Sequence, residues 1–138
     1  MKKGLFSTAM FVIAMLVMAL MIIAVAGSSN ANAKHKELEK VYQDKWCSAH
    51  HGTVEAKFPG EDVRCDCLTA DYAVEFDFAP KWAESVGQAL YYATLSGKKA
   101  TVVLIMEHPA DKIYVERVER LIKYHHLNVE VLTIENYK

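Results

Sequence analysis

The side chains best suited to chemistry lie in the stretch 64–92, where three acidic residues fall on two expected strands. Glu75 and Asp77 are two positions apart, so both side chains leave a strand on the same face, and Asp66 lies on the preceding strand. Carboxylate oxygens grouped in this way suit Mg²⁺ or Mn²⁺. Such an ion can hold a phosphodiester and lower the pKa of an attacking water, so the spacing predicts a metal-dependent site for phosphate chemistry.

A polar stripe on the helix that follows is expected to face this acidic group. Lys81, Ser85, Gln88 and Tyr92 succeed one another at helical spacing and share one face. The packing stripe of the same helix consists of Trp82, Val86, Ala89 and Ala93. The competing interpretation is that the stripe is the solvent side of an amphipathic helix and that the acidic residues lie on the exposed face of an edge strand.

The elements that must position these residues alternate in type along the chain. We expect helices over 34–50, 79–96 and 110–125, and strands over 53–58, 62–68, 72–78, 100–106 and 128–134. The uninterrupted apolar run in the fourth strand is typical of a strand buried on both faces. The order αβββαβαβ predicts one α/β domain, in which an antiparallel meander leads into two crossovers and helices flank a mixed sheet.

The first 33 residues are expected to be a leader and not part of the fold. They begin with two lysines, continue with an apolar run over 9–26 and end in the small-x-small sequence Ala31-Asn32-Ala33. This pattern predicts a signal peptide over 1–33, cleaved after Ala33, and a folded domain over 34–138. The alternative is an uncleaved leader that attaches the protein to the inner membrane, because the run approaches the length of a spanning helix. Both place the domain outside the cytoplasm, in the periplasm or secreted.

The charge of the domain is not that of a general nucleic-acid binder. The whole chain has 16 basic and 17 acidic residues, and all the acidic residues follow the leader. Removing the two leader lysines from the 16 basic residues leaves 14 against 17, a net charge of −3. Because phosphate contacts dominate nucleic-acid affinity, a nuclease of this charge would need a bound cation to supply positive charge.

The three cysteines, Cys47, Cys65 and Cys67, predict one disulfide and one remaining thiol, because export exposes them to an oxidising compartment. Cys65 and Cys67 are two apart on an expected strand and should point to one face, and Cys47 at the end of the first helix could reach either. A metal site built from all three is the alternative, but the spacing lacks the paired C-x₂-C knuckle.

Two histidine pairs, His50-His51 and His125-His126, raise the alternative of a zinc site. Adjacent residues on a helix point about 100° apart, so neither pair can chelate one ion by itself. Both pairs fall near expected helix C-termini, where the helix dipole favours imidazolium. His108, which precedes Pro109, is expected to cap a loop.

The stretch 66–92 resembles the PD-(D/E)xK nuclease superfamily, which has the restriction-endonuclease-like fold. Asp66 falls at the first metal-binding aspartate of that family, and Glu75 at the acidic residue of its ExK element. Gln88 and Tyr92 look like the Q-x-x-x-Y element of RecB-like members. The order αβββαβ is similar to the family core, and Glu39 lies where several members carry an additional glutamate on the first helix.

One residue departs from the family pattern, because Asp77 stands where an ExK element has lysine. In the family that lysine orients the attacking water and offsets charge in the transition state. Lys81, one turn into the next helix, is the first candidate to replace it, and Lys57 on the first strand is the second.

The resemblance implies an exported Mg²⁺- or Mn²⁺-dependent nuclease that acts on DNA more readily than on RNA. Asp66 and Glu75 would hold the metal with help from Asp77, and Lys81 would stand in for the displaced lysine. Gln88 and Tyr92 would position the substrate or the water. Two alternatives belong to other classes of protein. One is a catalytically inactive binding module on the same fold, and the other is a small disulfide-linked structural protein.

Overall fold

The computed structural model describes residues 35–137, and the signal peptide predicted over 1–33 lies outside the described residues. The helices and 3₁₀ turns are α2 (Glu39–Ala49), η1 (Ala79–Lys81), α3 (Trp82–Ser96), η2 (Pro109–Asp111) and α4 (Lys112–His125). The strands are β1 (Thr53–Lys57), β2 (Arg64–Leu68), β3 (Tyr72–Phe78), β4 (Lys99–Met106) and β5 (Val129–Glu135). Over the described range, none of the helices combines the length and the hydrophobicity needed to span a bilayer.

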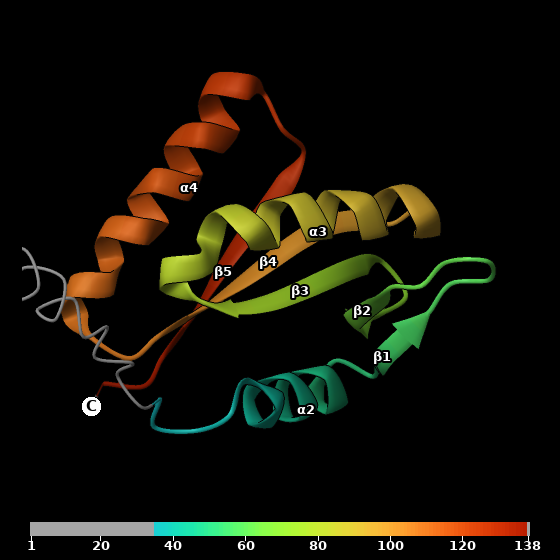
Figure 1. The fold of residues 1–138 in the computed structure, drawn as a ribbon, viewed down its shortest axis with the longest axis horizontal. Coiled ribbons are helices and arrows are strands. Elements are labelled where there is room, and N and C mark those ends of the chain that lie inside the picture. Colours follow the sequence, from blue (N-terminus) through green and yellow to red (C-terminus); the bar gives the residue numbers. More distant parts are fainter. Residues whose placement is uncertain (1–34, 138) are drawn as a thin grey trace, which may run out of the picture. The chain divides into compact units, whose positions relative to one another are not determined.

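The five strands form one mixed sheet in the order β1-β2-β3-β4-β5 (Figure 1). Strand β2 is antiparallel to both of its neighbours, β1 and β3, and β3, β4 and β5 run parallel. The α/β class, the mixed sheet and the element order αβββαβαβ that the sequence predicts are therefore confirmed. The acidic strand β3 lies in the centre of the sheet and not at its edge.

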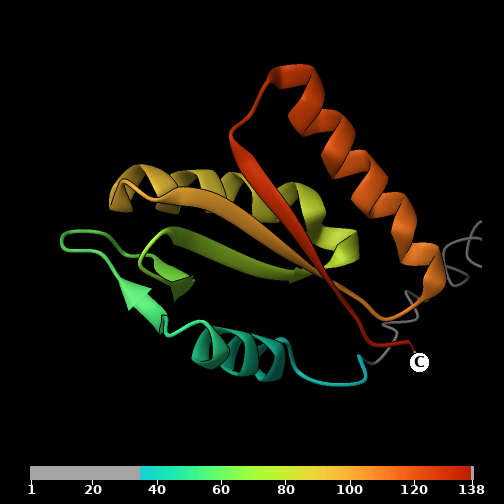
Figure 2. The same ribbon diagram turned by 180° about the vertical axis from the view of Figure 1, so that it is seen from behind.

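Helices cover both faces of the sheet. Helix α2 lies along one face, and α3 and α4 lie along the other, as the views from the two sides show (Figures 1 and 2). The predicted packing stripe of α3 belongs to the core on its side of the sheet, together with residues of β4 and α4. Gly97 ends α3 in the left-handed conformation at φ 68°, as expected for a C-cap glycine.

The element boundaries differ from the predictions mainly at the starts of elements. Helix α2 begins at Glu39 and not at residue 34, because the chain at Leu38 is extended and its side chain is exposed. The predicted strand over 62–68 begins at Arg64. The helices at Pro80 and Pro109 each begin with a 3₁₀ turn, and each proline lies in the first turn, where its missing N–H would have no helical acceptor.

The core has two sides, and β3 contributes to both. Val74 and Phe76 pack with Val103 of β4 beneath α2, and Ala73 packs with Tyr92 beneath α3. The apolar run of β4 is buried on both faces, as its sequence predicts. Strand β3 is therefore held in place from both sides, and the direction of its polar side chains is fixed.

One disulfide joins Cys47 of α2 to Cys67 of β2, with the Cα atoms 5.6 Å apart, and Cys65 remains a buried free thiol. The prediction of one bridge and one thiol is confirmed. Gly52 lies against this bridge, since a Cβ atom there would lie 2.4 Å from the Cys67 Sγ. Only a glycine fits so close to the bridge.

The expectation that Cys65 and Cys67 share a face is wrong. Cys67 packs beneath α2 with Val74, and Cys65 packs beneath α3 with Ala73. The alternation rule requires a regularly paired strand. Strand β2 pairs with β3 only at Cys67 and Leu68, and its ladder with β1 skips Asp66 opposite Glu55, whose φ of 53° is left-handed.

Candidate active site

Glu75 and Asp77 lie on the face of β3 that α3 covers, and both are buried, with 6% and 4% of their surface exposed. Neighbouring residues of the same strand, Val74 and Phe76, point to the opposite face. The competing interpretation, an acidic pair on the exposed face of an edge strand, is therefore wrong. Two carboxylates inside a central strand are costly to ionise unless a cation or a proton accompanies them.

Asp66 approaches the same place from β2. Its Oδ2 accepts a hydrogen bond from the backbone N–H of Phe76 at 2.8 Å. The Asp66 carboxylate thus binds a backbone N–H of β3 just beyond the last residue pair between β2 and β3. This bond fixes Asp66 beside Glu75, so the departure from regular pairing creates the carboxylate cluster.

One oxygen of Glu75 has no partner. Its Oε2 is buried and accepts no hydrogen bond from any described residue. A buried polar atom left without a partner costs about 1–3 kcal/mol, so such atoms are rare in folded proteins and point to a missing ligand or proton. The Glu75 and Asp66 side chains also share a hydrogen bond, which requires a proton on one of the two carboxyl groups. A cation in place of that proton would satisfy Oε2 and offset the repulsion among the carboxylates.

Burial and mutual repulsion raise the pKa values of these carboxyl groups. The pKa of Glu75 is raised far above its ordinary value, first by burial and then by the charges of Asp66, Asp77 and Glu39. Burial also raises the pKa of Asp66, although the hydrogen bond from Phe76 opposes the shift. The cluster therefore holds protons at neutral pH when no cation is present, and a bound cation would displace them.

Glu39 on the first turn of α2 completes the cluster from the opposite side of the sheet. Burial, followed by the charges of Asp77 and Asp66, raises its pKa to about 7. Gln43, one turn further along α2 and itself buried, donates a hydrogen bond to Glu39 Oε1 at 3.0 Å. The sequence indicated Glu39 only through the family resemblance and did not indicate Gln43, although its spacing of four residues from Glu39 is a usable signal.

Lys81 is the lysine that reaches the acidic residues. Its Nζ lies 3.5 Å from Asp77 Oδ1, and its side chain is 61% exposed. Burial raises the pKa of Asp77, and the charge of Lys81 opposes that shift. Lys57 instead lies at the end of β1, where it lines a hollow of the β1–β2 hairpin with Glu61 and Asp62. Of the two predicted substitutes for the family lysine, only Lys81 lies beside a predicted metal ligand.

The polar stripe of α3 turns inward. Ser85 is fully buried and donates a hydrogen bond to the backbone oxygen of Trp82 at 2.9 Å. Tyr92 is buried and hydrogen-bonded to Gln88, and burial, followed by the charge of Glu75, raises the pKa of its phenol to about 12. The interpretation of this stripe as a solvent-facing surface is wrong for Ser85 and Tyr92, because the acidic face of β3 lies beneath the helix.

The remaining candidate groups lie elsewhere. The four histidines of the two pairs are exposed, and the N–H of His108 donates to Asp111 at the start of η2, which agrees with the predicted capping role. Within residues 35–137, no three or more histidine, cysteine, aspartate or glutamate side chains are arranged as they would be around a bound metal ion.

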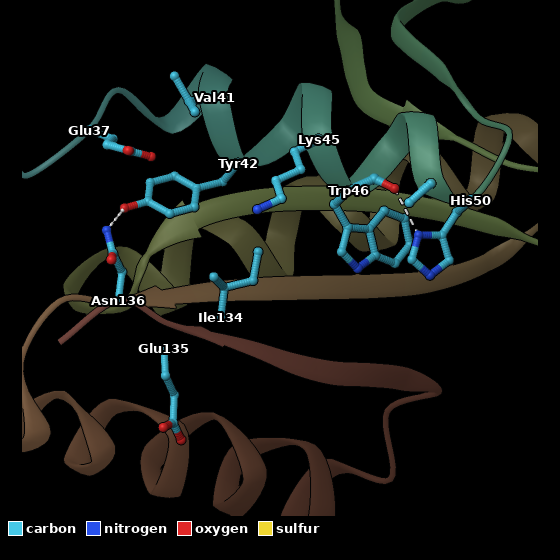
Figure 3. Close-up of a pocket in the computed structure, with 10 residues that line it drawn as sticks. Glu37, Val41, Tyr42, Lys45, Trp46, His50, Ile134, Glu135 and Asn136 are labelled. Atoms are coloured by element: carbon cyan, nitrogen blue, oxygen red, sulfur yellow. Dashed lines mark hydrogen bonds between the residues drawn. The ribbon is translucent and has the colours of Figure 1, made fainter. Parts of the chain in front are cut away.

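A hollow of about 470 Å³ lies between α2 and the end of β5 (Figure 3), and its lining does not include Asp66, Glu75 or Asp77. Tyr42, Trp46 and Ile134 line it, and the Tyr42 hydroxyl accepts a hydrogen bond from Asn136 at 2.5 Å. Charged residues of both signs surround it, among them Glu37 and Lys45, so its charge favours no particular class of ligand.

Comparison of the chain with known protein families, with characterised proteins and with solved structures gives no match.

Proposed function

We propose that this protein is an exported, metal-dependent enzyme that hydrolyses phosphodiester bonds of nucleic acid, on a restriction-endonuclease-like version of the α/β fold. The observation that carries the proposal is the buried, unpartnered Oε2 of Glu75 among three further carboxylates. A divalent cation with oxygen ligands and open positions for water and phosphate accounts for both the unpaired atom and the unfavourable crowding of negative charge.

Each residue near the cluster takes a role from its position. Asp66 and Glu75 would hold the metal, and Asp77 would assist. The Lys81 ammonium, 3.5 Å from Asp77 and largely exposed, is free to approach a phosphate or the attacking water and replaces the lysine that the family carries two residues after the glutamate. Gln88 and Tyr92 border the acidic face from α3, where Gln88 orients the Tyr92 hydroxyl.

The bound metal would polarise the phosphodiester and generate the nucleophile by lowering the pKa of a water. It would also supply the positive charge that a domain with a net charge of −3 needs to approach nucleic acid. DNA is the preferred substrate by the family resemblance, and RNA is the alternative.

The decisive experiment incubates the purified protein with plasmid, linear and single-stranded DNA and with RNA, each with Mg²⁺, with Mn²⁺ or with a chelator. Glu75→Ala should abolish cleavage because it removes the metal ligand. Glu119→Ala, which removes an exposed carboxylate from α4, is the matched control and should cleave normally. Metal-dependent cleavage that survives Glu75→Ala would contradict the assignment of the site.

A catalytically inactive binding module on the same fold is the second candidate, and Asp77 at the lysine position favours it. A metal titration distinguishes a working metal site from an inactive binding module. A working site gains thermal stability with Mg²⁺ or Mn²⁺ by mass action, and Glu75→Ala loses that gain. A folded protein that cleaves none of the substrates, and whose stability does not respond to either metal, would support the binding module.

A further inference from the structure

A second hollow, of about 320 Å³, lies between the start of α3 and the C-terminal half of α4. Its lining consists of Trp82, Arg117, Arg120, Leu121, Tyr124 and His125. Trp82 is half-buried, and the Tyr124 side chain is 78% exposed. The lining contains none of the carboxylates of the candidate active site, so the two sites are distinct.

The positive charge of the domain is concentrated on the helix that forms one wall of this hollow. Helix α4 carries four basic and two acidic residues, whereas the segment after the leader has a net charge of −3. Arg117 and Arg120 form no ion pair within residues 35–137. The Arg117 Cζ lies 5.3 Å from the centroid of the Tyr114 ring, a cation–π contact.

The arginines and the exposed tyrosine lie on one face of α4. Arg117, Arg120 and Tyr124 are three and four residues apart, so their side chains follow one another along the helix. Glu116 lies one turn before Arg120, but within residues 35–137 the two form no ion pair. The lining of the hollow combines the two guanidinium groups with aromatic rings and contains no carboxylate.

This combination matches the chemistry of single-stranded nucleic acid. A guanidinium group binds a phosphate through two parallel hydrogen bonds. Unpaired bases can stack on the rings of Trp82 and Tyr124, and a flat base can enter the hollow. The bases of a duplex cannot bind in this way, because neighbouring bases cover their faces. We propose that the hollow between α3 and α4 binds single-stranded nucleic acid, with Arg117 and Arg120 on phosphates and Trp82 and Tyr124 on bases.

The position of Trp82 links this surface to the proposed activity. Trp82 directly follows Lys81, whose ammonium group faces Asp77, so the first turn of α3 borders both sites. The choice of nucleic acid as the polymer rests on the proposed function. The binding itself needs no metal, because the arginines supply the positive charge.

The test measures binding of a short fluorescently labelled single-stranded DNA by anisotropy, with a chelator present so that no cleavage occurs. Arg117→Ala/Arg120→Ala should weaken binding tenfold or more and reduce the slope of log affinity against log salt by roughly 1.4, since each phosphate contact contributes about 0.7 on a single strand. Tyr124→Ala should weaken binding about fivefold or more and leave the salt slope unchanged.

The matched control is Lys112→Ala/Lys123→Ala, which removes the same charge from exposed positions of α4 outside the lining of the hollow. Equal losses in the two double variants would overturn the proposal, because they would show a general charge effect. It would also be overturned by tighter binding to duplex DNA, by absence of binding, or by attachment to phosphatidylserine vesicles that depends on the arginines while single-stranded DNA binding does not.

Glu75→Ala separates this proposal from the proposed function. The variant should bind single-stranded DNA as well as the unaltered protein does and should lose only cleavage. A protein that binds through the arginines but cleaves no substrate would support the binding site in the hollow and contradict the proposed nuclease activity. Cleavage that persists with normal efficiency in a protein that does not bind single strands would support the nuclease activity and overturn the proposal that the hollow binds single-stranded nucleic acid.

Discussion

The two faces of β3 differ in what their side chains do for the fold. Val74, Phe76 and Phe78 point toward α2 and pack with apolar residues of neighbouring elements. Glu75 and Asp77 alternate with them and point toward α3, where burial raises the pKa values of both carboxyl groups. One strand therefore stabilises the domain through one face and destabilises it through the other. The proposed function accounts for residues that work against stability in this central strand.

The apolar face should give the largest effect. Phe76 is 1% exposed, and its ring lies 5.7 Å from that of Trp46 on α2, measured between ring centroids. Phe76→Ala should lower the free energy of unfolding by about 3–5 kcal/mol, because it removes apolar contacts and leaves a cavity. Urea denaturation measures this change. Leu38→Ala, at an exposed apolar position, is the control and should change the stability little.

The disulfide on the same side of the sheet should give the next largest effect. The Cys47–Cys67 bridge joins residues 20 apart in the sequence and ties α2, which carries Glu39, to β2, which carries Asp66. Cys47→Ser/Cys67→Ser should lower the free energy of unfolding by about 3 kcal/mol through the greater freedom of the unfolded chain. Thermal unfolding with and without a reductant checks this. The reductant should lower the melting temperature of the unaltered protein and leave that of the double variant unchanged.

The acidic face should give a smaller effect of the opposite sign. The pKa of Glu75 is raised on folding, so without metal the folded protein keeps a proton that the unfolded chain releases above its ordinary pKa of 4.5. The corresponding stability is fully present below that pH and is lost as the pH rises through the folded pKa. The metal-free protein should therefore unfold more easily at about pH 8 than at about pH 5.

Glu75→Gln should stabilise the metal-free protein at about pH 8 by on the order of 1–3 kcal/mol, because it removes a titration worth about 1.4 kcal/mol for each pKa unit. The gain should disappear near pH 4, where the glutamate is protonated in both states. Denaturation in a chelator across this pH range measures it. A gain that is equal at all these pH values would show that packing and not charge explains the difference.

The cysteines show where sequence reasoning reached its limit. Their number and the leader predicted one bridge and one thiol, which the structure confirms. The sequence left open whether Cys47 pairs with Cys65 or with Cys67, and the assumption that Cys65 and Cys67 share a face was wrong. That assumption needed a regular strand, but the carboxylate of Asp66 takes the Phe76 N–H and the strand leaves its alternation there.

The acidic residues show the same limit in the candidate site. Alternation along β3 placed Glu75 and Asp77 on one face, and helical spacing placed Lys81 one turn beyond. Spacing could not decide whether that face is solvated or buried. Burial depends on strand order, and β3 is central because both a hairpin neighbour and a crossover neighbour pair with it. The bond from Gln43 to Glu39 follows from their spacing within α2, but the place of Glu39 beside Asp66 and Asp77 depends on how α2 lies against the sheet.

The sequence by itself determined the elements, their order and the α/β class, because apolar periodicity, prolines and the C-cap Gly97 act over a few residues. Tertiary structure alone decided the burial of the carboxylates, the partner of Cys67 and the unsatisfied oxygen of Glu75. These properties arise where residues distant in sequence meet, as when Asp66 of β2 and Glu39 of α2 converge on β3. The spacing within one element cannot specify what the neighbouring elements place beside it.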